Sequence, residues 1–408
     1  TRRSSDLLLS TATFSGISAI SLRSGSSFSF TLLFAIFKLG EDFLQQDANV
    51  GFVVNDQKLL GLRYHIDAEI TQWFDADAKA LQAKIDALLP STANRVTLPK
   101  RGGSPWVLVE SFADQQPWMT QLYQRETGKL LRVGVSHPAI KPAQMGQTDF
   151  IRYKARDGLD IPAYITLPAG GVKKNLPLVV LVHGGPWVRG FSWQWDAEVQ
   201  FLASRGYAVL QPEFRGSTGF GGKHFHAGWK QWGQAMQDDV ADGTRWAIAQ
   251  GIADPKRICI AGASYGGYAT LMGLIKDPDL YRCGINWVGV TDINLMYTVS
   301  WSDFSGEWKR YGMPRMVGDP MADAAMLKAN SPLENAARVS QPLLMAYGGR
   351  DVRVPLVHGE KFRDAVTKHN KQVEWVVYPE EGHGWHKAET RIDFWGRVEK
   401  FLARNLAL

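Results

Sequence analysis

The stretch Gly262-Ala263-Ser264-Tyr265-Gly266 decides how this sequence is interpreted. It follows an apolar run over residues 257–261 and precedes a run with helical spacing over residues 269–275. A G-x-S-x-G pentapeptide between a strand and a helix is typical of a nucleophile elbow, a turn so tight that glycines stand on both sides of the serine. The N–H groups that begin the following helix would face the point where negative charge develops.

A serine hydroxyl is a weak nucleophile unless a base and an orienting acid accompany it. Both candidates lie downstream: Asp351 follows an apolar run over residues 342–347, and His383 follows another over residues 373–378. Each therefore sits just past the carboxyl end of a predicted strand, and in an open α/β sheet these ends share one rim. The chain order Ser, Asp, His matches the α/β-hydrolase arrangement. We predict that Ser264, Asp351 and His383 form a catalytic triad.

Several other polar residues are weaker candidates for a catalytic or metal-binding role. His386 is a rival base, but it lacks the flanking glycines of His383, and we expect Glu380 and Glu381 in a solvated turn. His224 and His226 form an H-x-H pair, but no third ligand follows at the spacing of a metal site. No metal ion and no cofactor are predicted.

The composition excludes several classes of protein. The 408 residues are 45% apolar and 21% charged with a net charge of +6, which is ordinary for a globular protein. No cluster of Lys and Arg is interleaved with aromatic residues, so nucleic-acid binding is not expected. No run reaches the roughly 18 apolar residues of a membrane helix. Cys259 and Cys283 lie in apolar runs and are expected to be buried free thiols, which leaves cytoplasmic and periplasmic or secreted locations open.

The sequence divides into three parts. Residues 1–45 are serine-rich without sustained periodicity and form a poorly specified lead-in whose native origin is open. Residues 46–137 contain strand-like runs and a helical run over 76–89, similar to about two blades of a β-propeller, which needs roughly four or more blades to close. From residue 138 strands alternate with helices, which predicts a doubly wound, mostly parallel sheet over 138–408. The chain starts at Thr1 and its first methionine is Met119, so we expect further sequence upstream.

Five motifs give the chain a family resemblance. They are His183-Gly184-Gly185-Pro186, the run over residues 213–221, the elbow with Gly267-Tyr268, the run over residues 351–355, and Glu381-Gly382-His383-Gly384. With these motifs the chain resembles the prolyl oligopeptidase family of serine peptidases, and most of all its acylaminoacyl-peptidase and dipeptidyl-peptidase branches. The likeness covers residues 138–408, and 46–137 more loosely.

The resemblance implies roles for the predicted triad. Ser264 attacks the scissile carbonyl of a small peptide substrate, His383 takes the proton and returns it to the leaving amine, and Asp351 orients the imidazole. The oxyanion donors correspond to the backbone N–H groups of Tyr265 and Gly185. In the dipeptidyl-peptidase branch a tyrosine hydroxyl at the position of His183 donates instead, so this chain departs from that branch.

The resemblance also implies a substrate pocket and leaves alternatives open. Arg353 either holds a substrate carbonyl or forms a surface salt bridge. The resemblance does not decide between exopeptidase and endopeptidase action. It also leaves open whether the protein forms a homo-oligomer. The rival interpretations are a carboxylesterase or lipase with the same triad, and a catalytically idle fragment. The expected lining of the pocket, apart from Arg353, is Tyr268, Val290, Ile293, Met296 and Val354.

Overall fold

The computed structural model describes residues 51–55, 58–99, 103–171 and 173–406, which form two compact units. The N-terminal unit contains the described part of residues 1–111 with residues 119–135 and 218–222, and the C-terminal unit contains residues 112–118, 136–217 and 223–406. The predicted lead-in over residues 1–45 lies outside the described residues. Among the described residues, every helix is too short or too polar to span a lipid bilayer.

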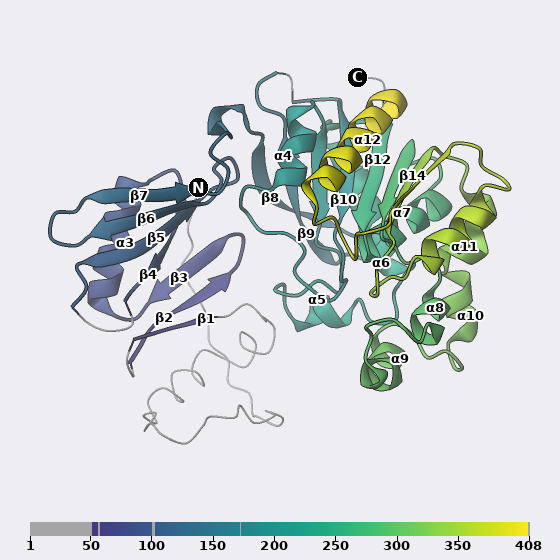
Figure 1. Cartoon of the computed structure of the whole chain (residues 1–408), viewed down its shortest axis with the longest axis horizontal. Helices are drawn as coiled ribbons and strands as arrows, with labels where there is room; N and C mark the ends of the chain where they lie inside the picture. Colours follow the sequence, from purple (N-terminus) through teal and green to yellow (C-terminus); the bar gives the residue numbers. More distant parts are fainter. Residues whose placement is uncertain (1–50, 56–57, 100–102, 172, 407–408) are drawn as a thin grey trace. The chain divides into compact units, whose positions relative to one another are not determined.

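In its described residues, the N-terminal unit has a three-stranded sheet, a four-stranded sheet and one helix (Figure 1). Helix α3 (Ala76–Leu88) matches the predicted helical run, and the Asp75 side chain caps it by accepting the Ala78 N–H at 3.0 Å. Ile85, Val96 and Val107 are fully buried in the core of this unit. The three-stranded sheet is β1 (Gly51–Asn55), β2 (Lys58–His65) and β3 (Glu69–Trp73), and the four-stranded sheet is β4 (Ala93–Thr97), β5 (Trp106–Phe112), β6 (Met119–Gln124) and β7 (Leu130–Val135).

The C-terminal unit contains an eight-stranded sheet in the order β15-β14-β13-β12-β10-β11-β9-β8. The six strands from β15 to β11 in this order are parallel, and β9 and β8 add an antiparallel edge. This is the mostly parallel sheet that the sequence predicted. The strands are β8 (Gln147–Lys154), β9 (Asp160–Leu167), β10 (Leu176–Val182), β11 (Ala208–Pro212), β12 (Ala253–Ala263), β13 (Cys283–Trp287), β14 (Leu343–Gly348) and β15 (Val373–Tyr378).

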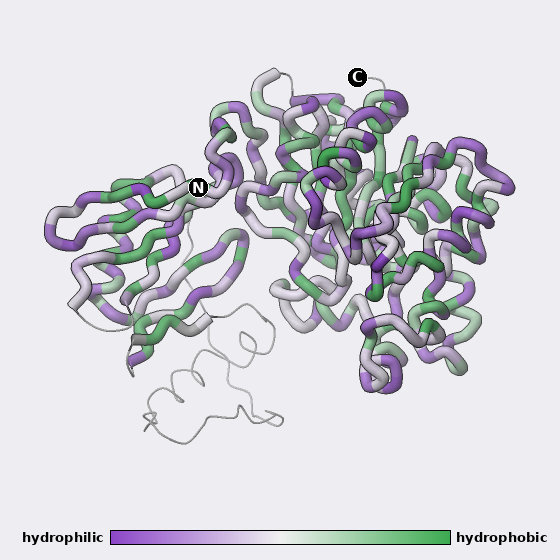
Figure 2. The backbone as a smooth tube through the Cα atoms, viewed as in Figure 1, coloured by the Kyte–Doolittle hydropathy of each residue, from purple (hydrophilic) through white to green (hydrophobic). Residues whose placement is uncertain are grey.

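Alternate residues of each inner strand face opposite helical layers, because side chains alternate across a strand. Leu178 and Val180 pack in the cluster with α6 (Ala235–Ala249), α7 (Tyr265–Lys276) and α11 (Val357–Val366). Val179 and Leu181 pack with α4 (Ala197–Ser204) and α12 (Ala388–Leu406), which crosses in front of the sheet in Figure 1. Figure 2 shows hydrophobic green segments in these inner strands, whereas α12 alternates green and purple along its length, as a helix covering one face of a core should.

The two cysteines lie side by side in the centre of this sheet. Cys259 of β12 and Cys283 of β13 are register partners, and both are free and fully buried, as predicted. The shorter elements fill the connections between the main ones. They are η1 (Pro142–Gln144), α5 (Gly222–His226), α8 (Ile293–Thr298), the π-helix η2 (Trp308–Gly312), α9 (Met313–Met316), α10 (Ala324–Ala329) and η3 (Pro332–Arg338).

Candidate active site

Ser264 stands at the turn between β12 and α7, in a backbone conformation that is rare for a residue with a side chain. Its φ is 59° and its ψ is −119°. The surrounding structure holds the turn: the Ser264 N–H donates to the Trp287 carbonyl at 3.1 Å, and the Ser264 carbonyl accepts the Tyr268 N–H at 3.0 Å. Such conformations cost about 1–3 kcal/mol and persist where their neighbours fix them. The hydroxyl is thereby presented at the carboxyl end of the sheet.

Glycines allow this turn to lie close to neighbouring backbone. A Cβ atom on Gly262 would stand 2.5 Å from the Val182 carbonyl oxygen, and one on Gly266 would stand closer still. A Cβ atom on Gly184 would lie 3.3 Å from the Ser264 Cβ atom, so the loop after β10 passes directly beside the serine. The glycines of the elbow are therefore required for the reason inferred from the sequence.

Asp351 and His383 are joined by a hydrogen bond. The His383 Nδ1 atom lies 2.8 Å from Asp351 Oδ2, and the Asp351 side chain is fully buried. Asp351 Oδ1 accepts the N–H groups of Arg353 at 2.8 Å and Val354 at 2.9 Å. Because a carboxylate only accepts, Nδ1 is the donor, and Nε2 of a neutral imidazole is left with a free lone pair.

The loops that carry Asp351 and His383 are packed backbone against backbone. The Gly349 N–H donates to the Tyr378 carbonyl at 2.9 Å at the end of β15. A Cβ atom on Gly349 would lie 2.6 Å from the Pro379 carbonyl oxygen, and one on Gly348 would lie 2.6 Å from the Glu381 carbonyl oxygen. The Gly-Gly pair that precedes Asp351 thus lets the two loops approach closely.

Glu381 was expected in a solvated turn, and that interpretation is wrong. Its side chain is 2% exposed and accepts the N–H groups of His386 and Lys387, both at 2.9 Å. Burial alone would raise the pKa of this carboxyl, but these donors outweigh it and lower the pKa to about 2. Glu380 does face solvent, where it pairs with Arg350 at 2.6 Å, and the His386 side chain is 80% exposed. Glu381 therefore anchors the loop that follows His383.

Ser264 and His383 line one cavity of about 340 Å³. Gly185 and Tyr265, the predicted oxyanion residues, also line it, as does Arg353. Val290, Met296 and Val354, three residues of the expected substrate pocket, contribute apolar surface to it. The other large apolar residues of the lining are Trp232, Trp287, Val288 and Phe304. The lining of the cavity thus combines polar groups, among them Ser264 and His383, with apolar side chains.

Two of the predicted pocket residues lie elsewhere. Tyr268 and Ile293 are fully buried and neither lines this cavity. The Tyr268 hydroxyl donates to the Asn330 carbonyl at 2.8 Å. Both belong to the core cluster beneath α7. Among the lining residues that were not predicted, Trp232 stands in a stretch with five tryptophans over residues 187–232. Phe304 stands in an irregular segment without a sequence signal.

Arg353 forms the salt bridge that was one of the two interpretations left open by the sequence, and it also lines the cavity. Its Nε atom donates to Asp303 Oδ1 at 2.6 Å, and its side chain is half exposed while it lines the cavity. The hydrogen bond from Arg353 lowers the pKa of Asp303, and the nearby His383 contributes in the same direction. The guanidinium is therefore held at the edge of the cavity and keeps further N–H groups for a ligand.

The His183 ring is buried and is not part of the cavity lining. Its Nδ1 atom lies 2.7 Å from the Gly184 carbonyl oxygen, and its Nε2 atom lies 2.9 Å from Ser217 Oγ. Burial lowers the pKa of His183 to about 4. The ring therefore supports the loop from within.

The H-x-H pair is also used for packing. His224 is buried with Nε2 3.0 Å from the Phe214 carbonyl oxygen, and the His226 ring packs edge-on against Trp229 at 4.7 Å. In the ranges described above, no group of three or more His, Cys, Asp or Glu side chains is arranged to hold a metal ion.

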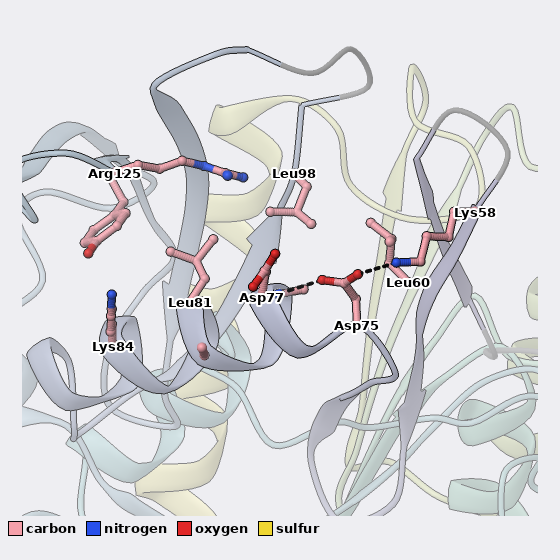
Figure 3. Close-up of a pocket in the computed structure, with 11 residues that line it drawn as sticks. Lys58, Leu60, Asp75, Asp77, Leu81, Lys84, Leu98 and Arg125 are labelled. Carbon is pink, nitrogen blue, oxygen red and sulfur yellow. Dashed lines mark hydrogen bonds and ion pairs between the residues drawn. The ribbon is translucent and has the colours of Figure 1, made fainter.

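A second cavity, of about 610 Å³, lies within the N-terminal unit (Figure 3). The Lys58 ammonium, which lines it, points at the Asp75 carboxylate 2.6 Å away. Lys84 and Arg125 bring further positive charge, and Asp77 a further negative one. None of the predicted catalytic residues lines this cavity. The volume of a cavity therefore does not identify the site that contains Ser264 and His383.

Comparison with known proteins assigns the family. The model of the prolyl oligopeptidase family matches residues 193–408, which is more than half of the chain. The chain belongs to the prolyl oligopeptidase family. It is thus a member of a family of serine-type peptidases, as the motifs suggested.

Relatives and solved structures agree with this assignment. Dipeptidyl aminopeptidase BIII of Pseudoxanthomonas mexicana is 35% identical over 346 residues, 81% of this chain and 49% of that protein. The acylamino-acid-releasing enzyme of Sus scrofa is 27% identical and matches 64% of this chain and 35% of its own length. A puromycin-hydrolyzing peptidase of Mycobacterium tuberculosis superposes with a TM-score of 0.73 at 22% identity, over 88% of this chain and 54% of that one. The predicted α/β-hydrolase fold is confirmed, and the chain spans about half the length of the curated relatives it matches.

Proposed function

We propose that this chain is a serine peptidase that hydrolyses short peptides through Ser264, His383 and Asp351. The observation that carries the proposal is the 2.8 Å hydrogen bond between His383 Nδ1 and the buried Asp351 carboxylate, on the same cavity as the elbow serine. The hydrogen bond fixes which imidazole nitrogen holds the proton, so the other nitrogen serves as the base.

In the acylation step His383 Nε2 takes the proton of the Ser264 hydroxyl while Oγ attacks the scissile carbonyl carbon. The carbonyl oxygen becomes an oxyanion, for which the N–H groups of Tyr265 and Gly185 are the proposed donors. The imidazolium then gives its proton to the leaving amine, the C–N bond breaks, and an acyl-enzyme remains. Water, deprotonated by His383, attacks the ester in the second half, and the acid product leaves as the serine regains its proton.

The charges and hydrogen bonds around the site support the roles proposed for these residues. Asp351 accepts three hydrogen bonds in a fully buried position, so its negative charge is fixed beside the imidazole that becomes positive. Tyr265 begins α7, where the first N–H groups have no partner within the helix and face developing negative charge. Losing one such donor typically costs about 2.7–4 kcal/mol of barrier.

The lining of the cavity suggests the substrate. Apolar side chains beside Ser264 favour peptides with an apolar residue at the cleaved bond, and the Arg353 guanidinium is placed to hold a carbonyl of the substrate. The relatives named dipeptidyl aminopeptidase and acylamino-acid-releasing enzyme support action on peptides rather than simple esters. We further propose that the N-terminal unit, residues 46–137 in the predicted division, is part of a β-propeller that limits substrates to short peptides.

Two measurements test the function. Wild type should be labelled by a fluorophosphonate probe, and labelling should disappear in Ser264→Ala. Dipeptidyl and acylaminoacyl anilides should then be hydrolysed alongside short-chain esters. An unlabelled wild type would refute an active triad, and strong ester turnover without amide cleavage would favour the esterase interpretation.

A further inference from the structure

A fully buried carboxyl group lies beneath the active site and takes no part in the proposed reaction. Glu213 follows β11 and is 0% exposed. Its Oε1 atom accepts the Phe191 N–H at 2.6 Å, and its Oε2 atom accepts the Gly190 N–H at 3.1 Å. Both donors belong to the loop over residues 183–191, which we call the oxyanion loop because it carries Gly185. Glu213 therefore fixes the far end of this loop.

The same carboxyl group also reaches the beginning of the oxyanion loop. Its Oε2 atom lies 3.5 Å from His183 Nε2, and that nitrogen is 2.9 Å from Ser217 Oγ. The other ring nitrogen, Nδ1, lies 2.7 Å from the Gly184 carbonyl oxygen. Since a carbonyl only accepts, Nδ1 carries the ring proton. The Ser217 hydroxyl has one proton, and its oxygen also lies 2.8 Å from the Phe214 carbonyl oxygen, to which it donates. The His183 ring thereby stands between Glu213 and the peptide group that precedes Gly185.

The two ends of the loop also pack against each other. A Cβ atom on Gly190 would lie 2.5 Å from the His183 Cβ atom, so the chain closes directly over the imidazole. The His183 ring is sandwiched further by Phe214, stacked at 4.3 Å between ring centroids, and Phe191, edge-on at 5.5 Å. Between these ends Gly184 lies beside Ser264 and Gly185 lines the cavity. Moving the Glu213 contacts would therefore move the Gly185 N–H relative to Ser264.

Burial of the Glu213 carboxyl group is unfavourable in free energy. This indicates that the group has a role beyond filling space in the core. Burial raises the pKa of Glu213 to about 7, against the opposing effect of the Gly190 and Phe191 donors. An apolar side chain would avoid this penalty, but it would leave two backbone N–H groups of the loop without an acceptor.

We propose that Glu213 is a positioning residue for the oxyanion loop, acting on the Gly185 N–H through its hydrogen bonds to residues 190–191 and through His183 and Ser217. This inference rests on the proposed function. Because the oxyanion exists only during the reaction, a displaced donor lowers kcat and leaves ground-state binding of the substrate nearly unchanged.

The test compares Glu213→Gln with a milder change in the same network, Ser217→Ala. Glutamine keeps the size of Glu213 but replaces one acceptor oxygen by an NH2 group, so one loop N–H loses its partner. We expect kcat for a peptide anilide to fall about 10- to 100-fold, with KM within about twofold of wild type. Ser217→Ala, which removes only the hydroxyl beside His183, should lower kcat several-fold. The rate of fluorophosphonate labelling should fall in parallel, because that reaction also develops an oxyanion.

A matched control is Asp114→Asn, in the C-terminal unit. Asp114 is 7% exposed and accepts the Thr148 N–H at 2.7 Å, yet it does not line the cavity. This variant should keep wild-type kcat. The inference is overturned if Glu213→Gln and Ser217→Ala both turn over like wild type, if the loss lies in KM, or if Asp114→Asn loses as much kcat. A wild type that neither labels nor cleaves anilides refutes the proposed function instead, so the two failures are distinguishable.

Discussion

Replacing Ser264 by glycine removes the hydroxyl and, at the same time, the side chain that makes the elbow backbone unfavourable. The serine holds φ at 59° and ψ at −119°, a conformation that costs a residue with a Cβ atom about 1–3 kcal/mol. Glycine adopts it freely, although its extra backbone entropy in the unfolded chain costs about 0.5–1 kcal/mol relative to alanine. We therefore expect Ser264→Gly to be more stable than Ser264→Ala by about 0.5–2 kcal/mol.

Comparing Ser264→Gly with Ser264→Ala isolates the effect of the backbone conformation on the free energy of unfolding, because both variants lack the hydroxyl and both should be inactive. Urea unfolding followed by tryptophan fluorescence gives the difference in free energy of unfolding between them. Ala263→Gly is the control: Ala263 is the last residue of β12 and has no positive φ, so glycine there should destabilise the protein by about 0.5–1 kcal/mol.

Opposite signs at the two neighbouring positions are the expected result. If glycine destabilises the protein at position 264 by as much as it does at position 263, the elbow stores no strain and the reasoning fails. Residual labelling of Ser264→Gly by a fluorophosphonate would show that another nucleophile is the reactive group.

Three further predictions concern other parts of the molecule. Asp351→Asn should lower kcat by about 10³–10⁴-fold with little change in KM, because the amide no longer fixes the imidazole proton; a loss below tenfold in steady-state kinetics would contradict the triad. Glu381 has a folded-state pKa below its unfolded value, so its contribution to stability is present above about pH 4.5 and is lost as the pH falls toward 2. Urea midpoints of Glu381→Gln should therefore decline less than those of wild type between about pH 5 and pH 3, and parallel declines would contradict this. Asp75→Ala should destabilise the N-terminal unit by about 1 kcal/mol by removing the cap of α3, measured by thermal unfolding, with Asp77→Ala costing less.

Local patterns were enough to predict the central elements of the C-terminal unit. The apolar runs at residues 257–261, 342–347 and 373–378 became β12, β14 and β15 because short apolar runs between turn residues are buried strands of a parallel sheet. Their carboxyl ends lie on one rim by topology alone, so Asp351 and His383 could be paired before any distance was known. The 2.8 Å hydrogen bond between them follows from that arrangement.

Burial and partners of individual side chains were less predictable, because they depend on segments distant in the sequence. Tyr268 shares the α7 surface with residues near the cavity, yet its hydroxyl is bound by the Asn330 carbonyl in the core. Glu381 looked like a turn residue until the N–H groups five and six positions later folded back onto its carboxylate. Phe304 reaches the cavity from an irregular segment without periodicity.

Hydrophobic periodicity and glycine spacing are properties of a few adjacent residues, and they were sufficient to predict the fold class, the elbow and the chain order of the three proposed triad residues. The packing of distant loops was needed to place the carboxyl group of Glu213 under the loop that carries Gly185, to turn the His183 ring inward, and to pair Arg353 with Asp303 at the edge of the cavity. Each of these depends on a buried contact between separate loops, and the energy of such a contact is not encoded in either loop alone.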